Sequence, residues 1–240
     1  METGNIIKEN SNKSCSQNKK EIIEIILGIR KDDKIKSTLQ LALESARYHC
    51  GIEGNGDIDN FSFLTRQQII DKIVKNVDLD VPSDEADLFS ALLSYFICLE
   101  QIGTIFFRKP KSRKRENGIV KAIKMFSNEQ LTENELKALK NLRNSLGHAF
   151  GLVNVNVKKA THKYTLSFKE ESNKILELPK KEWDGNYLDK TIETSTIIYV
   201  FPLIRFIERA IRNVVDEYHK GTLDSISLEE IKSRFTIRVN

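Results

Sequence analysis

The feature that most constrains the fold is the apolar run over residues 88–107, LFSALLSYFICLEQIGTIFF. Just before it, Ser83 is a favourable helix N-cap, and Asp84 and Glu85 complement the positive end of a helix dipole. Apolar side chains then surround the helix axis, which is the pattern of a helix covered on all sides. We therefore expect this helix to be the centre of the hydrophobic core.

The same run is long enough to span a bilayer, so a membrane span is the alternative. Glu100 and Gln101 lie inside it, and such groups are costly in hydrocarbon, so we favour a core helix without membrane attachment. Glu100 is the only charged residue between Leu88 and Phe107. A carboxylate on a core helix needs a partner, for which Arg143 and His148 are the candidates, unless it simply reaches solvent.

The rest of the chain predicts a mainly α fold, a helical bundle with a small antiparallel β insertion. Helical spacing recurs over residues 21–30, 37–50, 65–76, 119–126, 187–219 and 224–234, with a break at Pro202. A further helix begins with a capping box formed by Thr132 and Glu135, and its apolar stripe is Leu136, Leu139, Leu142 and Leu146. Spacing of two predicts a three-stranded meander over 152–157, 162–168 and 174–178. His162 is expected to be exposed on its strand. We assign 1–19 to a disordered polar tail and 20–240 to a single domain, with the insertion at 152–178.

The composition indicates the class of protein but not its activity. Of the 240 residues, 40% are hydrophobic and 30% charged, a balance typical of soluble globular proteins. The net charge of +4 permits a polyanionic partner but does not require one. Cys15, Cys50 and Cys98 show no Cys-x-x-Cys spacing, so neither a disulfide framework, a zinc site nor another metal or cofactor is indicated. The N-terminus lacks the apolar segment of a signal peptide, and we expect a cytoplasmic protein.

The chemistry is concentrated in Arg143-Asn144-Ser145-Leu146-Gly147-His148. Cutting RNA without a metal requires a base for the ribose 2′-hydroxyl and a cation for the charge that gathers on the phosphorane. His148 suits the first role, because imidazole gains and loses a proton near neutral pH. Arg143 suits the second, because its guanidinium is permanently charged and matches phosphate. Asn144 lies four residues before His148, so its amide can orient the imidazole or hold a phosphate oxygen.

Arg143 is less well placed on a regular helix. Five residues at about 100° each leave it roughly 140° around the helix from His148. Convergence therefore needs the length of the Arg side chain, a helix that loosens near Gly147, or a second copy of the chain.

This motif resembles the R-x4-6-H signature of the HEPN superfamily, in which the Arg is typically followed by Asn, Asp or His. The resemblance implies a helical core with the motif late in a helix and a homodimer that brings two motifs together. It also implies metal-independent endoribonuclease activity on RNA, as in bacterial toxins, antiphage defence effectors and RNA-processing factors. Arg143, Asn144 and His148 would be catalytic, with Glu100 in support, and an antitoxin or regulatory protein would be a further partner.

Two groups of cations are candidates for contacts with an RNA backbone. The alternatives are a solvated loop for the first group and surface pairing with Glu208 and Asp216 for the second. The first group is Arg108, Lys109, Lys111, Arg113, Lys114 and Arg115, and the second is Arg205, Arg209 and Arg212.

Two other interpretations of the chain stay open. One is a non-catalytic HEPN-like module that binds RNA or a nucleotide, or that dimerises. The other is an unrelated helical interaction protein in which His148 caps a helix end and interacts with its dipole.

Overall fold

The computed structural model describes residues 17–50, 84–108, 116–149, 151–156, 159–168 and 174–238. The chain is mostly helical with small sheets, so the mainly α prediction is confirmed. The helices are the segment 17–26, α2 (Thr38–His49), α4 (Asp84–Ile105), α5 (Gly118–Phe126), α6 (Glu133–Ala149), α7 (Val200–His219) and α8 (Leu228–Phe235). The strands are β1 (Ile35–Ser37), β2 (Phe106–Arg108), β3 (Val153–Asn156), β4 (Lys159–Ser167), β5 (Leu176–Glu177), β6 (Thr196–Tyr199), β7 (Leu223–Ser225) and β8 (Thr236–Arg238).

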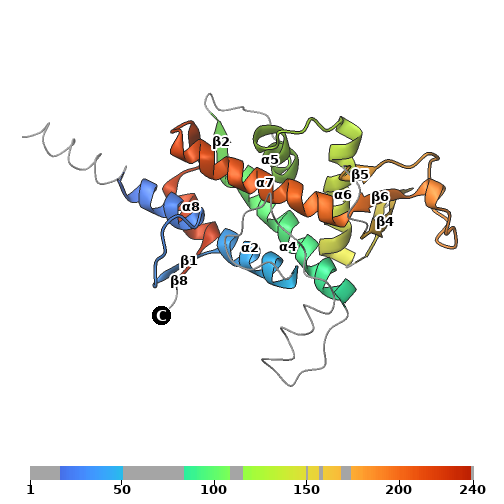
Figure 1. Ribbon diagram of the computed structural model, residues 1–240, viewed down its shortest axis with the longest axis horizontal. Coiled ribbons are helices and arrows are strands. Elements are labelled where there is room, and N and C mark those ends of the chain that lie inside the picture. The colour runs from blue at the N-terminus through green and yellow to red at the C-terminus, as the bar shows by residue number, and fades with distance from the viewer. Residues whose placement is uncertain are drawn as a thin grey trace, which may run out of the picture.

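Helix α4 is the centre of the core, as its sequence predicts. It packs against α2, α5, α6 and α7, and in Figure 1 it crosses behind α7 with α2 on one side and α5 on the other. Leu92, Phe96 and Ile102 on α4 are fully buried. Within the described residues, Asp87–Ile105 of this helix is the one segment long and apolar enough to cross a membrane. Its packing on four other helices favours the core helix over the span.

A pair of glycines sets the contact between α4 and α5. A Cβ atom built on Gly103 would lie 1.8 Å from the carbonyl oxygen of Gly118, and one built on Gly118 would lie 2.5 Å from the carbonyl oxygen of Glu100. Only glycine allows two helix backbones to approach this closely. Asn117 caps α5 by accepting a hydrogen bond from the Ile119 amide.

Two short antiparallel pairs join distant parts of the chain. β1 pairs with β8, with Ile35 opposite Arg238, and β2 pairs with β7, with Phe106 opposite Ser225. Helix α4 therefore ends at Ile105, and the last apolar residues expected to be helical form a strand instead. The predicted helix at 65–76 and the Ser83 cap lie outside the described residues, and the helix at 17–26 takes three residues that we had assigned to the tail.

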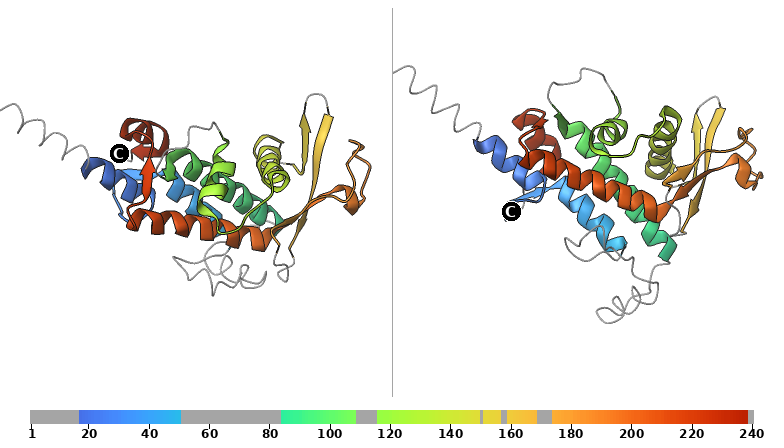
Figure 2. Two further views of the ribbon diagram at one scale, coloured as in Figure 1. Left: turned by 90° about the horizontal axis from the view of Figure 1, so that it is seen from above. Right: turned by 45° about the horizontal axis from the view of Figure 1, so that its top comes forward.

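The predicted β insertion is confirmed as strands but differs in connectivity. β3 and β4 form an antiparallel hairpin, yet the strand order is β3-β4-β6-β5, with β6 parallel to β4 and antiparallel to β5. The prediction of a meander was therefore wrong, because β6 comes from residues 196–199, which we had assigned to a helix. Pro202 follows in the first turn of α7, where its missing N–H costs nothing. This sheet lies at one end of the molecule, opposite α8 and the helix at 17–26 (Figure 2).

Candidate active site at the end of α6

The sequence of α6 fixes the position of the motif. The Thr132 amide donates to Glu135 at 2.7 Å and the Glu135 amide donates to the Thr132 hydroxyl at 3.3 Å, which completes the predicted capping box. The predicted apolar stripe is buried in the core, and it consists of Leu136, Leu139, Leu142 and Leu146. Because α6 continues to Ala149, Arg143 and His148 lie within about its last two turns.

Arg143 crosses to the central helix and forms an ion pair with Glu100 through Nη2 and Oε2. The two side chains are 24% and 33% exposed, so the pair lies at the edge of the core. This is one of the two partners that were considered for Glu100, the only charged residue between Leu88 and Phe107. The Nε atom of Arg143 is buried and has no hydrogen-bond partner among the described residues.

Gly147 leaves part of the Arg143 guanidinium uncovered. Gly147 is exposed, and a Cβ atom at this position would lie 3.7 Å from Arg143 Nη1 and 3.9 Å from Leu93 Cδ1. A side chain here would therefore lie against the guanidinium. With glycine, Nη1 keeps its donors while Nη2 is held by Glu100.

His148 is exposed and Asn144 is half-buried, and in the described part of the chain neither side chain makes a hydrogen bond or ion pair. The helix end is closed by Ser145, whose hydroxyl donates to the Asn141 carbonyl at 3.0 Å and whose carbonyl accepts from the Gly151 amide at 3.3 Å. A single copy thus joins Arg143 to Glu100 but joins neither of them to His148. The orienting role of Asn144 stays a prediction.

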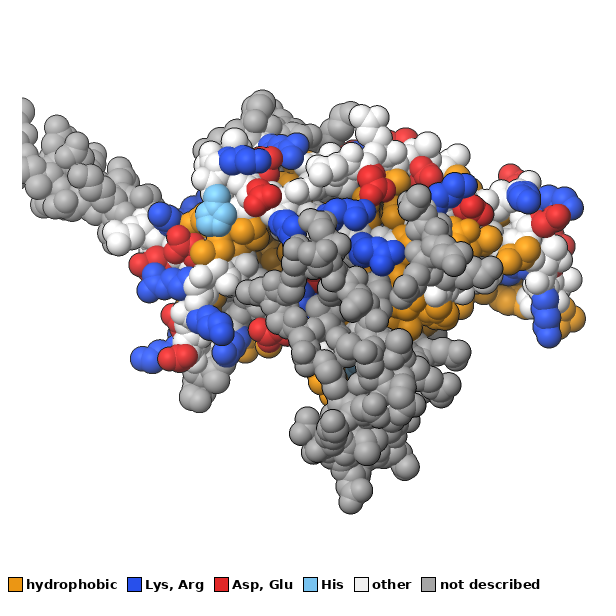
Figure 3. Space-filling model, viewed as in Figure 1, with side chains coloured by type: hydrophobic (Ala, Val, Ile, Leu, Met, Phe, Trp, Pro, Cys, Tyr) orange, Lys and Arg blue, Asp and Glu red, His pale blue; other side chains and the backbone are white. Residues whose placement is uncertain are grey.

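The predicted RNA-binding cations lie in different surroundings. Arg108 pairs with Glu217 at 3.1 Å and Arg209 with Glu129 at 2.9 Å. Arg205 and Arg212 are half-buried on α7. Basic and acidic side chains alternate on the described surface shown in Figure 3. The other five residues of the first group, Lys109, Lys111, Arg113, Lys114 and Arg115, lie outside the described residues.

Glu208, one of the two acids considered as partners for the arginines of α7, belongs to a buried network. Glu208 is 2% exposed and accepts hydrogen bonds from Arg47 Nε at 2.8 Å, Arg47 Nη2 at 2.7 Å and the Tyr95 hydroxyl at 2.7 Å. Burial raises the pKa of Tyr95, and the neighbouring Glu208 raises it further. The sequence did carry a signal, because Glu208 lies four residues after Ile204 and three before Ile211, on the apolar stripe of α7. This network joins α2, α4 and α7 and is structural.

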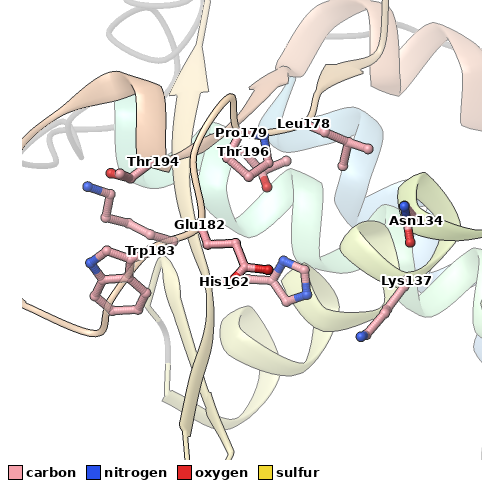
Figure 4. A pocket seen from close by; sticks show the side chains of 10 residues that line it. Asn134, Lys137, His162, Leu178, Pro179, Glu182, Trp183, Thr194 and Thr196 are labelled. Carbon is pink, nitrogen blue, oxygen red and sulfur yellow. The ribbon is translucent and has the colours of Figure 1, made fainter.

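Sequence reasoning also missed a cavity of about 390 Å³ between the first turns of α6, strand β4 and the segment 178–196 (Figure 4). His162 lines it and is half-buried, so the expectation that it would be exposed was wrong. Burial lowers the pKa of His162, and the charge of Lys137 lowers it further. The imidazole is therefore neutral at physiological pH.

The described residues contain no cluster of three or more His, Cys, Asp or Glu side chains that could hold a metal ion. Cys50 and Cys98 are buried free thiols, and burial raises the pKa of each. Such thiols are poor nucleophiles.

Comparison with known proteins gives no relative. No protein-family model, no curated protein and no solved structure matches the chain.

Proposed function

We propose that this chain is a metal-independent endoribonuclease that acts as a homodimer, with His148 as general base or acid and Arg143 as the phosphate clamp. The observation that carries the proposal is the ion pair between Glu100 and Arg143, which fixes a guanidinium at the same helix end as the exposed His148. The R-x4-6-H resemblance points to the same residues.

The two groups have the properties that the reaction needs. An exposed imidazole can take the proton of a ribose 2′-hydroxyl and return one to the leaving oxygen. A guanidinium held in one orientation stabilises the phosphorane without rearranging during the reaction. Arg143 Nη1 lies beside Gly147, where a Cβ atom would be 3.7 Å from it, and the Arg143 side chain is 24% exposed.

The geometry of α6 favours a site shared by two copies. Arg143 turns toward α4, whereas His148 is roughly 140° around the helix from it. A second copy related by two-fold symmetry would bring the Arg143 of one protomer to the His148 of its partner. The resemblance adds the biological setting, a cytoplasmic toxin or antiphage effector controlled by an antitoxin or regulatory protein.

The test is cleavage of total RNA by wild type, His148→Ala and Arg143→Ala, purified in parallel and assayed with EDTA. We expect wild type to cut, His148→Ala to lose activity and Arg143→Ala to fall by at least about a hundredfold. His219→Ala is the matched control, because His219 is also exposed in the last turn of its helix and should cut normally. Full activity in His148→Ala, or complete inhibition by EDTA, would contradict the proposal.

A mixing experiment tests the shared site. If Arg143 of one copy serves His148 of the other, mixing the two inactive variants restores one intact site in each heterodimer. Random exchange then returns up to about a quarter of the wild-type activity. No recovery in a mixture shown to contain heterodimers would mean that each protomer works alone.

A non-catalytic RNA-binding or dimerising module is the second candidate. It is favoured by one observation, that Glu100 already compensates the charge of Arg143 within a single copy. Pure protein that binds RNA at high concentration without cutting it would support this candidate over the ribonuclease.

A further inference from the structure

The cavity beside α6 is built from three separate parts of the fold. Asn134 and Lys137 come from the first turns of α6, His162 and Lys163 from β4, and the remaining residues from the segment that ends in β6 (Figure 4). This last group is Leu178, Pro179, Glu182, Trp183, Thr194 and Thr196. The cavity has a volume of about 390 Å³, which lies in the range of pockets that hold small molecules, about 300–1,000 Å³.

One buried hydroxyl in this cavity has no partner. Thr196 is 1% exposed, and its Oγ1 atom makes no hydrogen bond among the described residues. A buried hydroxyl without a partner is costly, and native structures rarely contain one without a reason. A ligand in the cavity would supply the missing hydrogen bond.

The other polar groups of the cavity divide into supporting and available ones. Lys163 donates to the Asp189 carbonyl, the Asp189 carboxylate and the Thr191 carbonyl at 2.9 to 3.1 Å, so its role is to hold the segment that closes the cavity. His162 stacks on Tyr164 at 5.9 Å between ring centroids and makes no hydrogen bond among the described residues, although the Glu182 side chain points toward it in Figure 4. Lys137 is exposed and has no ion-pair partner among the described residues.

The apolar wall suits a flat ring. Trp183 is 6% exposed and is fixed by a hydrogen bond from its Nε1 atom to the Asn186 carbonyl at 3.1 Å. Leu178 and Pro179 are further apolar residues that line the cavity. A nucleobase offers a flat ring with donors and acceptors on its edge, which an uncharged imidazole and a hydroxyl can recognise. The nearby ammonium of Lys137 suits the attached phosphate.

The helix connects this cavity to the motif. Lys137 and His148 are eleven residues apart, which is about 20° around the helix and about 16 Å along it. Asn141 and Asn144 fall on the same face between them. A polar stripe therefore runs from the cavity to His148.

We propose that the cavity binds one nucleotide of a single-stranded RNA, with its base between Trp183, His162 and Thr196 and its phosphate at Lys137, and that the strand continues along the polar stripe to His148. The strand part of this proposal rests on the proposed function, whereas the cavity does not.

Trp183 provides a direct measurement, because it is the only tryptophan of the chain. We would titrate the full chain with a short 2′-O-methyl RNA, which cannot be cut because its 2′-hydroxyls are blocked, and follow the emission of Trp183 at constant salt. The four ribonucleoside monophosphates are titrated in parallel. We expect the oligomer to change the emission and to bind at least about tenfold more tightly than any monophosphate.

Two variants assign the binding to the cavity. Thr196→Val removes the hydroxyl with little change of shape, and since that hydroxyl has no partner the variant should fold at least as well as wild type. We expect it to bind about tenfold more weakly. Lys137→Ala should also weaken binding, and Lys140→Ala, one turn away and outside the cavity lining, is its matched control for loss of general charge attraction.

Unchanged emission would overturn the proposal, and so would equal affinity in wild type and folded Thr196→Val. Equal binding of monophosphate and oligomer would overturn the strand part. Because the oligomer resists cleavage, binding that depends on Thr196 supports the proposed binding site even if the protein cuts no RNA. Cleavage without such binding would refute the binding site and leave the proposed ribonuclease activity standing.

Discussion

Replacing Arg47 with methionine should remove a substantial part of the free energy of unfolding of this protein. The substitution keeps most of the side-chain volume but removes both hydrogen bonds to the carboxylate of Glu208, which is 2% exposed. Hydrogen bonds to a charged group contribute about 1.5–3 kcal/mol each. Two of them give about 3–6 kcal/mol, in line with the 3–5 kcal/mol typical of breaking a buried pair from one side.

The lower half of that range is expected for Arg47→Met. The Arg47 side chain is itself 20% exposed, so removing it recovers some of the cost of its own burial. We expect a loss of about 3–4 kcal/mol, against a typical total of about 5–15 kcal/mol for a native domain. Tyr95→Phe removes one hydrogen bond to the same carboxylate and should cost about 1.5–3 kcal/mol.

The double variant Arg47→Met, Glu208→Leu, made in the Tyr95→Phe background so that no buried hydroxyl loses its acceptor, tests the cause. It leaves no charge buried without a partner, so it should be at least about 2 kcal/mol more stable than Arg47→Met in the same background. The assay is urea denaturation followed by far-UV circular dichroism, with comparisons made only where the denaturant slopes agree. The reasoning is refuted if Arg47→Met costs less than Tyr95→Phe, or if Glu208→Leu adds a further loss to Arg47→Met in the Tyr95→Phe background.

Two further predictions concern the glycine contact and the cavity. Gly103→Ala should destabilise the fold by at least about 3 kcal/mol, because its Cβ would lie 1.8 Å from the Gly118 carbonyl oxygen. Gly147→Ala is the matched control, because its Cβ would lie 3.7 Å from the nearest atom, Arg143 Nη1. It should stabilise α6 by about 0.5–1 kcal/mol in the same denaturation assay. The imidazole of His162 should titrate by NMR below the ordinary pKa of 6.5, mainly because of burial, and Lys137→Ala should raise its midpoint. At pH values near 6.5 the unfolded chain then binds more protons at His162 than the folded chain does. His162 therefore contributes stability above about pH 6.5 that is lost as the pH falls toward its folded pKa. A titration midpoint at or above 6.5 would contradict this prediction.

The parts that the sequence predicted are those fixed by local chemistry. The Thr132 and Glu135 capping box and the leucine stripe of α6 depend on residues three or four positions apart, so spacing is sufficient to find them. The pairing of Glu100 with Arg143 was predictable for a different reason. A carboxylate within the apolar part of a core helix needs a counter-charge unless it reaches solvent, and Arg143 was one of the two candidates for that role.

The features that the sequence did not predict depend on contacts between distant segments of the chain. The run at 196–199 has no periodicity of its own that separates a short strand from the start of a helix, and it becomes a strand because β4 and β5 lie on either side of it. Burial of His162 follows from the segment 178–196, which Lys163 and Asp189 hold over the strand. Neither contact can be inferred from neighbours in sequence.

Helix α6 places the proposed nucleotide-binding site and the proposed cleavage site at different positions along its length. Under the two proposals made above, the phosphate of one nucleotide is held at Lys137 and the bond is cut at His148, about 16 Å away on the same face of the helix. At the end of that face the Arg143 guanidinium pairs with Glu100, and among the described residues His148 makes no ion pair with it. A strand lying along one protomer therefore reaches a complete site only where the partner supplies its own Arg143. Dimerisation would then control cleavage without altering the cavity, and an inhibitor that separates the protomers would leave RNA bound but intact.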